Sequence, residues 1–292
     1  TAIGRNAGYV LTSGAENVFV GGLAGDGTDD GNFNTAVGYL ALSANCGSNN
    51  TAVGQRSLVS ATGDLNTSIG KEAGTLMSSG QRCTFVGALA GTSASTMEDS
   101  VAVGNDAGKF ATTAHSSVFI GADAGQGITG TKLTGNQNTA VGAQAGFLLQ
   151  GAAENNTLTG FGAGKAITTG SGNSFLGLNS GSLITTGDTG VIIGGYDGNS
   201  AGLDFRTSDN YMVLSDGAGT VKAFFRADGG FCPFIGGEGW VGALGAATML
   251  YSDDLDNMRI HQQDAAGSGR SLIAGFSASS TTSSGNLVIN IT

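Results

Sequence analysis

The sequence predicts an all-β fold: a parallel β-roll or β-solenoid of about twelve short rungs, followed by a small β-rich C-terminal region. Three observations support this prediction. A pattern of the form Asn-Thr-Ala-Val-Gly-x-x-Ala-Gly recurs along the chain, β-branched residues precede its first Gly, and the 292 residues include 53 Gly but a single Pro. Short strands that stack and are joined by Gly-containing turns have this periodicity and this composition.

The repeat is regular enough to define each rung. Its first Gly, called the corner glycine below, stands at 4, 21, 38, 54, 70, 87, 104, 121, 142, 160, 177 and 194. The spacings are 16 to 18 residues, with one of 21. The residue before the corner glycine is apolar in all copies but one, and the residue three before it is β-branched in all but one. We therefore expect a strand ahead of each corner glycine.

The rest of each rung predicts a second, shorter strand and a polar turn. Apolar residues recur seven positions after the corner glycine, among them Met77, Ile128 and Leu149. Two strands of about five residues and two short turns fit the repeat length. A coil of this size closes as a flattened two-sheet solenoid whose rungs stack every ~4.8 Å.

The recurring Gly, Asn and Cys residues have structural explanations. The corner glycine permits a positive φ or the close approach of a neighbouring rung. Asn recurs four positions before it, at 17, 34, 50, 66, 138, 156 and 173, where it can bond backbone or form a ladder. Cys83 occupies one such slot, and Cys46 and Cys232 lie far from it without a C-x-x-C motif, so isolated thiols are expected.

The position two residues before the corner glycine gives the first functional prediction. We expect the Val or Ile directly before the corner glycine to face the core. Because side chains alternate along a strand, the position two residues before the glycine then lies on the opposite face. No occupant is charged, whereas a sheet face in water normally carries polar side chains. We therefore expect copies of the chain to cover this face in a parallel homotrimer; a monomer with an apolar outer face is the alternative. The predicted interface residues are Phe19, Ala36, Ala52, Phe85, Ala102, Phe119, Ala140, Leu158, Phe175 and Ile192.

Several copies of the repeat resemble known fibrous proteins. The segments 34–42 (NTAVGYLAL), 50–58 (NTAVGQRSL) and 138–146 (NTAVGAQAG) resemble the NTAVG-type repeats of bacteriophage tail fibres. They are also similar to the SVAIG repeats in the heads of trimeric autotransporter adhesins, which 101–104 (VAVG) and 118–121 (VFIG) match best. Either resemblance, which covers residues 1 to about 199, implies a trimeric left-handed parallel β-roll.

The segment after the repeats favours the phage family. Residues 210–231 (NYMVLSDGAGTVKAFFRADGGF) predict two alternating strands around a turn at 216–219. This segment resembles the hairpin that follows such repeats in phage fibres, whereas an autotransporter would lead into heptads, and none follow residue 199. The predicted domains are a repeat shaft (1–199), a hairpin connector (200–235) and a C-terminal tip (236–292).

The tip collects residue types that are rare elsewhere in the chain. Aromatic faces beside carboxylates and Arg suit sugar binding. A receptor contact is therefore predicted, with the alternatives that the Trp lies in the core of a small cap domain and that the carboxylates lie in a solvated loop. The candidate residues are Trp240, Tyr251, Asp253, Asp254, Arg259 and His261. No metal site is predicted, because Asp26, Asp29 and Asp30 lack a complete ligand spacing for calcium.

Charge and motif content disfavour other function classes. A net charge of −10 without a basic run argues against nucleic-acid binding. The sequence contains no apolar stretch of 18 residues, so membrane insertion is not expected. No Ser elbow or Cys-His pair is present, and His115 and His261 lie far apart in the sequence. A non-enzymatic protein without cofactor is expected; a polysaccharide depolymerase with carboxylates from separate rungs is a less favoured alternative. Ice binding is disfavoured because Val18, Val101 and Val118 interrupt the Thr column.

These observations together predict a phage tail fibre. Its partners would be its own copies, other virion tail proteins and a glycan or protein on the host-cell surface, and its location would be the virion. The alternative is a trimeric autotransporter-type adhesin head on a bacterial surface.

Overall fold

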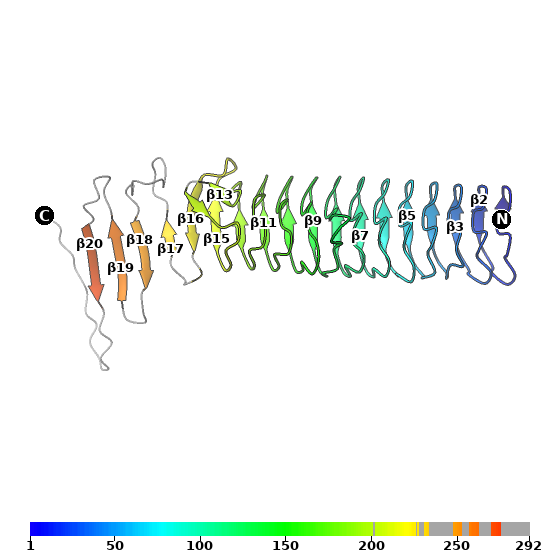
Figure 1. Ribbon diagram of the computed structural model, residues 1–292, viewed down its shortest axis with the longest axis horizontal. Helices are drawn as coiled ribbons and strands as arrows, with labels where there is room; N and C mark the ends of the chain where they lie inside the picture. The colour runs from blue at the N-terminus through cyan, green and yellow to red at the C-terminus, as the bar shows by residue number, and fades with distance from the viewer. Residues whose placement is uncertain are drawn as a thin grey trace, which may run out of the picture.

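The computed structural model describes residues 1–200, 202–225, 227, 231–233, 248–252, 257–262 and 270–275, with side chains described no further than Ala227. These residues form strands and turns and no helix, and residues 1–200 and 202–225 make a rod with one rung per repeat (Figure 1). The rung strands are β1 (Ala2–Ile3), β2 (Val18–Val20), β3 (Thr35–Val37), β4 (Thr51–Val53), β5 (Thr67–Ile69), β6 (Thr84–Val86), β7 (Val101–Val103), β8 (Val118–Ile120), β9 (Thr139–Val141), β10 (Thr157–Thr159), β11 (Ser174–Leu176) and β12 (Val191–Ile193).

The rungs stack as the repeat predicts. Each strand from β1 to β12 pairs in parallel with the next, and equivalent residues of the repeat stand opposite each other, as with Ala36 and Ala52. Backbone hydrogen bonds therefore run along the rod, and each strand supplies the partner groups for the next. The predicted parallel β-solenoid of about twelve turns is confirmed.

The corner glycine has both of its predicted roles. Its φ lies between 111° and 144° in the twelve rungs, a region that side chains with a Cβ rarely adopt. The next rung also approaches closely: a Cβ on Gly21 would lie 2.5 Å from the carbonyl oxygen of Gly38. Any larger residue would therefore both strain the backbone and force neighbouring rungs apart.

The prediction of two strands per rung is wrong, because each rung has one strand of two or three residues. The second leg of the coil crosses back in turns, and in the described residues its strand-like pairing is limited to isolated bridges such as Ala111 with Leu133. Residues in the left-handed region of φ explain why the second leg forms no regular strand. In most rungs the second residue after the corner glycine, such as Leu23, and the fourth, such as Gly25, have φ near +58°, which interrupts an extended strand.

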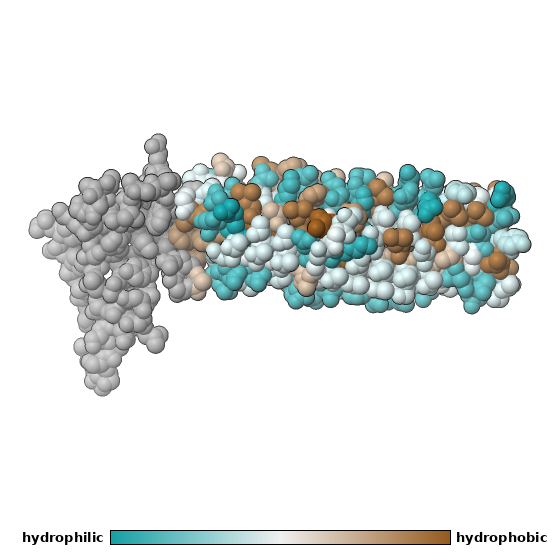
Figure 2. Space-filling view, in the orientation of Figure 1, coloured by the Kyte–Doolittle hydropathy of each residue, from teal (hydrophilic) through white to brown (hydrophobic). Residues whose placement is uncertain are grey.

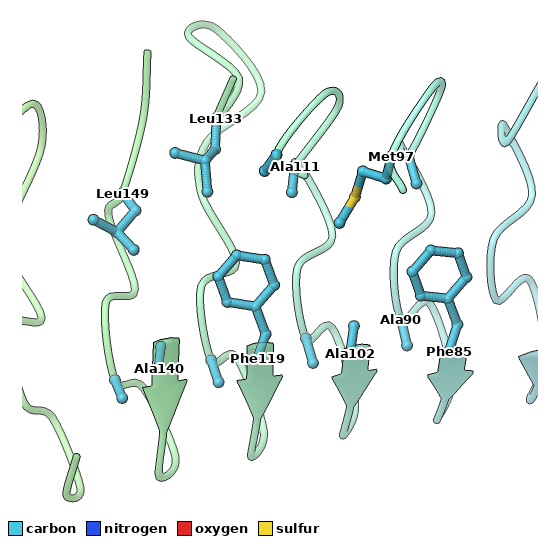
Figure 3. Packing of buried hydrophobic residues seen from close by; sticks show 14 of the residues in the cluster. Phe85, Ala90, Met97, Ala102, Ala111, Phe119, Leu133, Ala140 and Leu149 are labelled. Carbon is cyan, nitrogen blue, oxygen red and sulfur yellow. The ribbon is translucent and has the colours of Figure 1, made fainter. Parts of the chain in front are cut away.

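The core lies between the strand and the second leg of the same chain. Side chains two positions before the corner glycine point into the coil and meet side chains of the returning leg, as Figure 3 shows for Phe85 and Phe119. Ala residues three positions after the corner glycine, such as Ala90, are fully buried beside them. In the longest rung, Leu133 enters this core and Ile128, which the repeat spacing favours, does not. The extra residues loop out before the apolar position is reached.

A ladder of buried Asn side chains closes one end of the core. The backbone N–H of Asn50 donates to Oδ1 of Asn34 (2.8 Å), and that of Asn66 donates to Oδ1 of Asn50 (3.0 Å). Each Nδ2 also donates to a carbonyl, as Asn50 does to Gly63 (2.9 Å). Cys83 takes its place in the ladder with Sγ donating to the carbonyl of Met97 (3.3 Å). The polar groups of this ladder are therefore paired, as a folded interior requires.

A second ladder of hydrogen bonds lies on the exposed side of the Asn column, and its donors point toward the following rung rather than the preceding one. Here a backbone N–H donates to the side chain of the following rung: Ser48 to Asp64 Oδ1 (2.6 Å), Glu98 to His115 Nδ1 (3.1 Å) and Ser171 to Asp188 Oδ1 (2.6 Å). Side chains thus support the rung-to-rung stacking that the short strands begin.

The parallel stack continues past residue 199, where the predicted shaft ends. Strand β15 (Met212–Ser215) pairs in parallel with β12, and a short hairpin of β13 (Asn199–Ser200) and β14 (Leu203–Asp204) projects before it. Strand β16 (Val221–Phe225) then pairs antiparallel with β15, which is the hairpin that the sequence predicts. The backbone continues antiparallel through β17 (Phe231–Pro233), β18 (Thr248–Ser252), β19 (Asn257–Gln262) and β20 (Arg270–Gly275).

An aromatic cluster occupies the core where the parallel stack ends. Phe205 stacks on Tyr211 with ring centroids 4.7 Å apart, and it meets Tyr196 edge-on and Phe224 at a tilt. Tyr211 stands in the Asn column, and Gly190 in the preceding rung leaves room for the ring. The cluster covers the last rung of the solenoid.

Candidate interface on the outer sheet face

The predicted trimer-interface residues do not face a neighbouring chain. All of them are at most 1% exposed within a single chain, because they point into its own coil. The prediction is therefore wrong about which face of the strand is inside. The Asn column fixes the orientation, because Asn four positions before the corner glycine is buried and lies on the same strand face as the residue two positions before it. The residues concerned are Phe19, Ala36, Ala52, Phe85, Ala102, Phe119, Ala140, Leu158, Phe175 and Ile192.

The opposite strand face is turned outward and forms what we call the outer stripe. It consists of the residues one and three positions before each corner glycine: 24 residues, two in each of twelve rungs. None has an ionisable side chain, and their pattern is Thr-x-Val in its commonest form. Several large apolar members are substantially exposed, including Ile3 (60%), Leu176 (53%) and Ile193 (44%).

The outer stripe is long and continuous. Its rungs follow one another along the rod, so an uncharged band of fifteen Val, Ile or Leu residues and nine Thr or Ser residues extends over roughly 50 Å at ~4.8 Å per rung. Apolar residues recur along the rod surface in Figure 2, separated by polar ones. An uncharged surface of this extent, with exposed Val, Ile and Leu side chains along it, is typical of an interaction site.

The two edges of the outer stripe carry different charges. The two positions before the buried Asn column, called the leading flank, hold six acidic residues and one basic one in the eleven rungs from β2 to β12. The two positions after the corner glycine, called the trailing flank, hold three of each in the twelve rungs. The leading flank contains Glu16, Asp64, Arg82, Glu98, Asp99, Glu154 and Asp188, and the trailing flank contains Arg5, Arg56, Lys71, Glu72, Asp106 and Asp123.

Variation in rung length avoids the outer stripe and its flanks. The insertion in the longest rung forms a loop around 128–132, and the β13–β14 hairpin emerges from the equivalent part of its own rung. Both lie in the turn that ends the second leg, which we call the far edge. The strand, the corner glycine and the flanks keep one length in every rung from β2 to β12. The far edge tolerates extra residues and the stripe side does not.

Several ionisable groups on the rod form local ion pairs at its surface. Arg82 binds Asp99 through Nε and Oδ1 (2.5 Å), which lowers the pKa of that carboxyl. Arg206 bonds Asp204 and lowers its pKa to about 2, and Lys222 lowers the pKa of Asp216. These are surface pairs without a shared cavity. Within the described part of the chain, no group of three His, Cys, Asp or Glu side chains is placed to hold a metal ion.

The other residues singled out from the sequence are not brought together. Asp26 accepts a hydrogen bond from Ser43 (2.6 Å), and the backbone N–H of Asp29 donates to Asn45. Nδ1 of His115 accepts a hydrogen bond from the backbone N–H of Glu98 in the exposed ladder. Of the predicted receptor contacts, Trp240, Asp253 and Asp254 lie outside the described residues; Tyr251 lies on β18 and Arg259 and His261 on β19, where only the backbone is described.

The cysteines agree with the predicted isolated thiols where they are described. Cys46 and Cys83 are free and buried. Burial raises the pKa of Cys83 to about 11 and also raises that of Cys46, so both thiols resist ionisation.

Comparison with known proteins gives no match: no family model fits the chain, no curated protein matches its sequence and no solved structure matches its fold. Among the described residues there is also no helix with the length and apolar content needed to cross a bilayer.

Proposed function

We propose that the chain is the shaft and attachment segment of a homotrimeric phage tail fibre. The observation that carries the proposal is the outer stripe: 24 outward residues without one ionisable side chain, on a straight stack of rungs. The NTAVG-type repeats support the same assignment. Three copies that turn their stripes toward a common axis would remove this surface from water and leave the far edges outside.

The size of the stripe supports self-association. A stable protein interface involves about 20–30 residues on each side, and the stripe supplies 24. A second copy of the same chain repeats with the same rung spacing, so Val and Ile side chains can meet along the whole contact. The placement of insertions at the far edge also supports this arrangement, because loops there do not obstruct the stripes.

A shaft of stacked rungs suits a spacer between a virion and a cell surface. Its strands pair without a break from β1 to β12, and the core runs through the rungs from β2 onward, which favours a stiff rod. The host-surface contact, to a glycan or protein, is assigned to the C-terminal region as the sequence predicts. The shaft itself acts structurally and carries out no chemistry in this proposal.

Oligomeric mass is the direct test. Sedimentation equilibrium of the full chain should give three times 28.7 kDa. Ile69→Glu places a charge on the stripe and should yield a folded monomer, because Ile69 is 42% exposed and its loss opens no cavity. Ser79→Glu adds the same charge at the exposed far edge and should leave the trimer intact. A monomeric wild-type chain would contradict the proposal.

Location is tested separately. Antibodies against the chain, applied to negatively stained preparations, should label fibres attached to virions. Label on projections anchored in a bacterial membrane would support the adhesin instead. The assembled protein should also resist dodecyl sulfate without boiling, because many contacts in three chains must break together before it unfolds.

A further inference from the structure

The outer stripe by itself leaves the axial position of one copy against another undetermined. In most rungs the position three before the corner glycine is Thr or Val, and the position one before it is Val or Ile. A shift of one copy by one rung would therefore replace each contact between copies with a similar contact. This is the problem of strand register at the scale of whole rungs. A unique alignment needs features that do not repeat, and the flanks provide them.

Two cations on the trailing flank form no ion pair within the part of the chain that the structure describes. Arg5 and Arg56 are exposed, and neither forms an ion pair with a described residue. On the leading flank Glu16 is likewise exposed and forms no ion pair with the described residues, and Asp64 uses only Oδ1, to accept from Ser48. The buried Asn position, the three strand residues and the corner glycine, roughly 17 Å of extended chain, separate the two flanks within a rung. These charges therefore cannot pair within one chain.

The two possible pairs have the same geometry. Glu16 lies on the rung after Arg5, and Asp64 lies on the rung after Arg56. In each case the chain leaves the trailing flank, crosses the second leg and reaches the leading flank after rising by at most one rung, ~4.8 Å. Copies at equal height around one axis would place leading flank beside trailing flank and bring both pairs within reach of an Arg side chain.

We propose that ion pairs between copies, Glu16 with Arg5 and Asp64 with Arg56, fix the axial register of the assembly. This inference rests on the proposed self-association through the outer stripe. Antiparallel copies would place one acidic leading flank against another, which like charges oppose. In a closed arrangement of three parallel copies the axial shifts must cancel around the axis. A one-rung shift that brings the pairs level at one interface therefore separates them by two rungs or more at another, whereas alignment at equal height keeps both pairs within about one rung at all three interfaces.

A charge-reversal cycle on the full chain tests the pairing. Glu16→Arg and Arg5→Glu should each weaken association about tenfold or more near 50 mM salt, and the double variant should return to within about threefold of wild type. Asp64→Asn removes the charge but keeps the acceptor for Ser48, and it should weaken association in the same direction. Lys132→Glu is the matched control: it reverses an exposed cation at the far edge that forms no ion pair with the described residues, and it should have no effect.

Cross-linking reads the register directly. In a Cys232→Ser background, Val37→Cys should form disulfides between its own copies and should not cross-link with Val53→Cys, which stands one rung later. Equal cross-linking of both combinations, or reversals that act no differently from the Lys132 control, would overturn the inference while self-association stands. A monomeric wild-type chain would instead remove the proposed function.

Discussion

The ring of Phe19 occupies the space that a side chain on Gly25 would need. A Cβ on Gly25 would lie 2.6 to 2.7 Å from three carbons of that ring. Phe85 with Gly91 repeats this relationship. Where the strand offers Ala36 instead, the equivalent position holds Leu42, which is fully buried with φ of 49°. Volume is therefore exchanged between strand and returning leg in these three rungs, whereas Ala102 with Gly108 and Ala140 with Gly146 keep both positions small.

This exchange predicts a compensating pair of substitutions. Phe19→Ala should cost about 3–5 kcal/mol because it leaves a cavity, and Gly25→Leu should be destabilising because its side chain meets the ring. The double variant recreates the Ala36 and Leu42 arrangement and should be more stable than Phe19→Ala alone. Urea unfolding measures all three. A double variant whose loss equals the sum of the single losses would contradict the proposed exchange of volume.

The Asn ladder predicts a large effect from a small truncation. Asn50→Ala removes the acceptor for the backbone N–H of Asn66 and the donor to the carbonyl of Gly63, so two buried groups lose partners. The free energy of unfolding should fall by about 2–5 kcal/mol. Asn49→Ala, at the exposed neighbouring position, is the comparison. Because Asn49 has a φ of 62°, which Asn tolerates better than Ala, this substitution should lower the free energy of unfolding by roughly 1 kcal/mol, less than Asn50→Ala.

One buried hydroxyl should be dispensable. Ser68 points into the core two positions before its corner glycine, and its Oγ has no hydrogen-bond partner among the described residues. Ser68→Ala should stabilise the chain by about 1 kcal/mol, because burial of an unpaired hydroxyl is costly. Ser57→Ala should destabilise it, since Ser57 Oγ donates to the carbonyl of Ser68 (3.1 Å). Equal effects of the two substitutions in thermal unfolding would refute this distinction.

The buried thiol of Cys83 predicts alkaline sensitivity. Its folded pKa is about 11 against an ordinary 9.0, so between these values the unfolded chain releases a proton that the folded chain retains. The associated stability is fully present below pH 9 and is lost as pH rises toward 11, at up to about 1.4 kcal/mol per pH unit. Cys83→Ser, which copies the Ser residues found elsewhere in the same column, should show a shallower decline in urea titrations from pH 8 to 11.

Alkylation provides an independent check on the same thiol. In a Cys232→Ser chain, iodoacetamide at pH 8 should leave Cys46 and Cys83 unmodified until urea unfolds the protein, because both are buried and protonated. Modification of the native chain at the rate of a free thiol would contradict the described burial.

Periodicity was sufficient to predict the stacking of the fold but not its inside and outside. The corner-glycine spacing predicts the parallel register, and the Asn column predicts the ladder. Val and Ile suggested the core position more strongly than Ala because apolarity usually follows burial. The overlooked signal is parity: Asn34 and Ala36 stand two apart and face the same side, so a buried Asn ladder requires a buried Ala column.

The second leg escaped prediction for a different reason. Its geometry depends on left-handed residues such as Leu23 and Arg56, whose side chains do not ordinarily favour positive φ. Tertiary stacking imposes these conformations, so residue type alone does not reveal them. The predicted interface changes with the core. Because the Ala and Phe column lies inside the coil, the surface offered to a second copy is the Thr-x-Val stripe. The charges on its two flanks can then contact that copy, which composition alone does not indicate.

Because the hydrogen bonds of the strands and of both ladders lie along the rod, tension applied between its ends falls on them rather than on covalent bonds. Such a load would detach rungs one after another, and each would release roughly 50 Å of slack chain at about 3.3 Å per residue. The shaft would therefore yield in steps under pull, lengthening several-fold before any backbone bond is stretched.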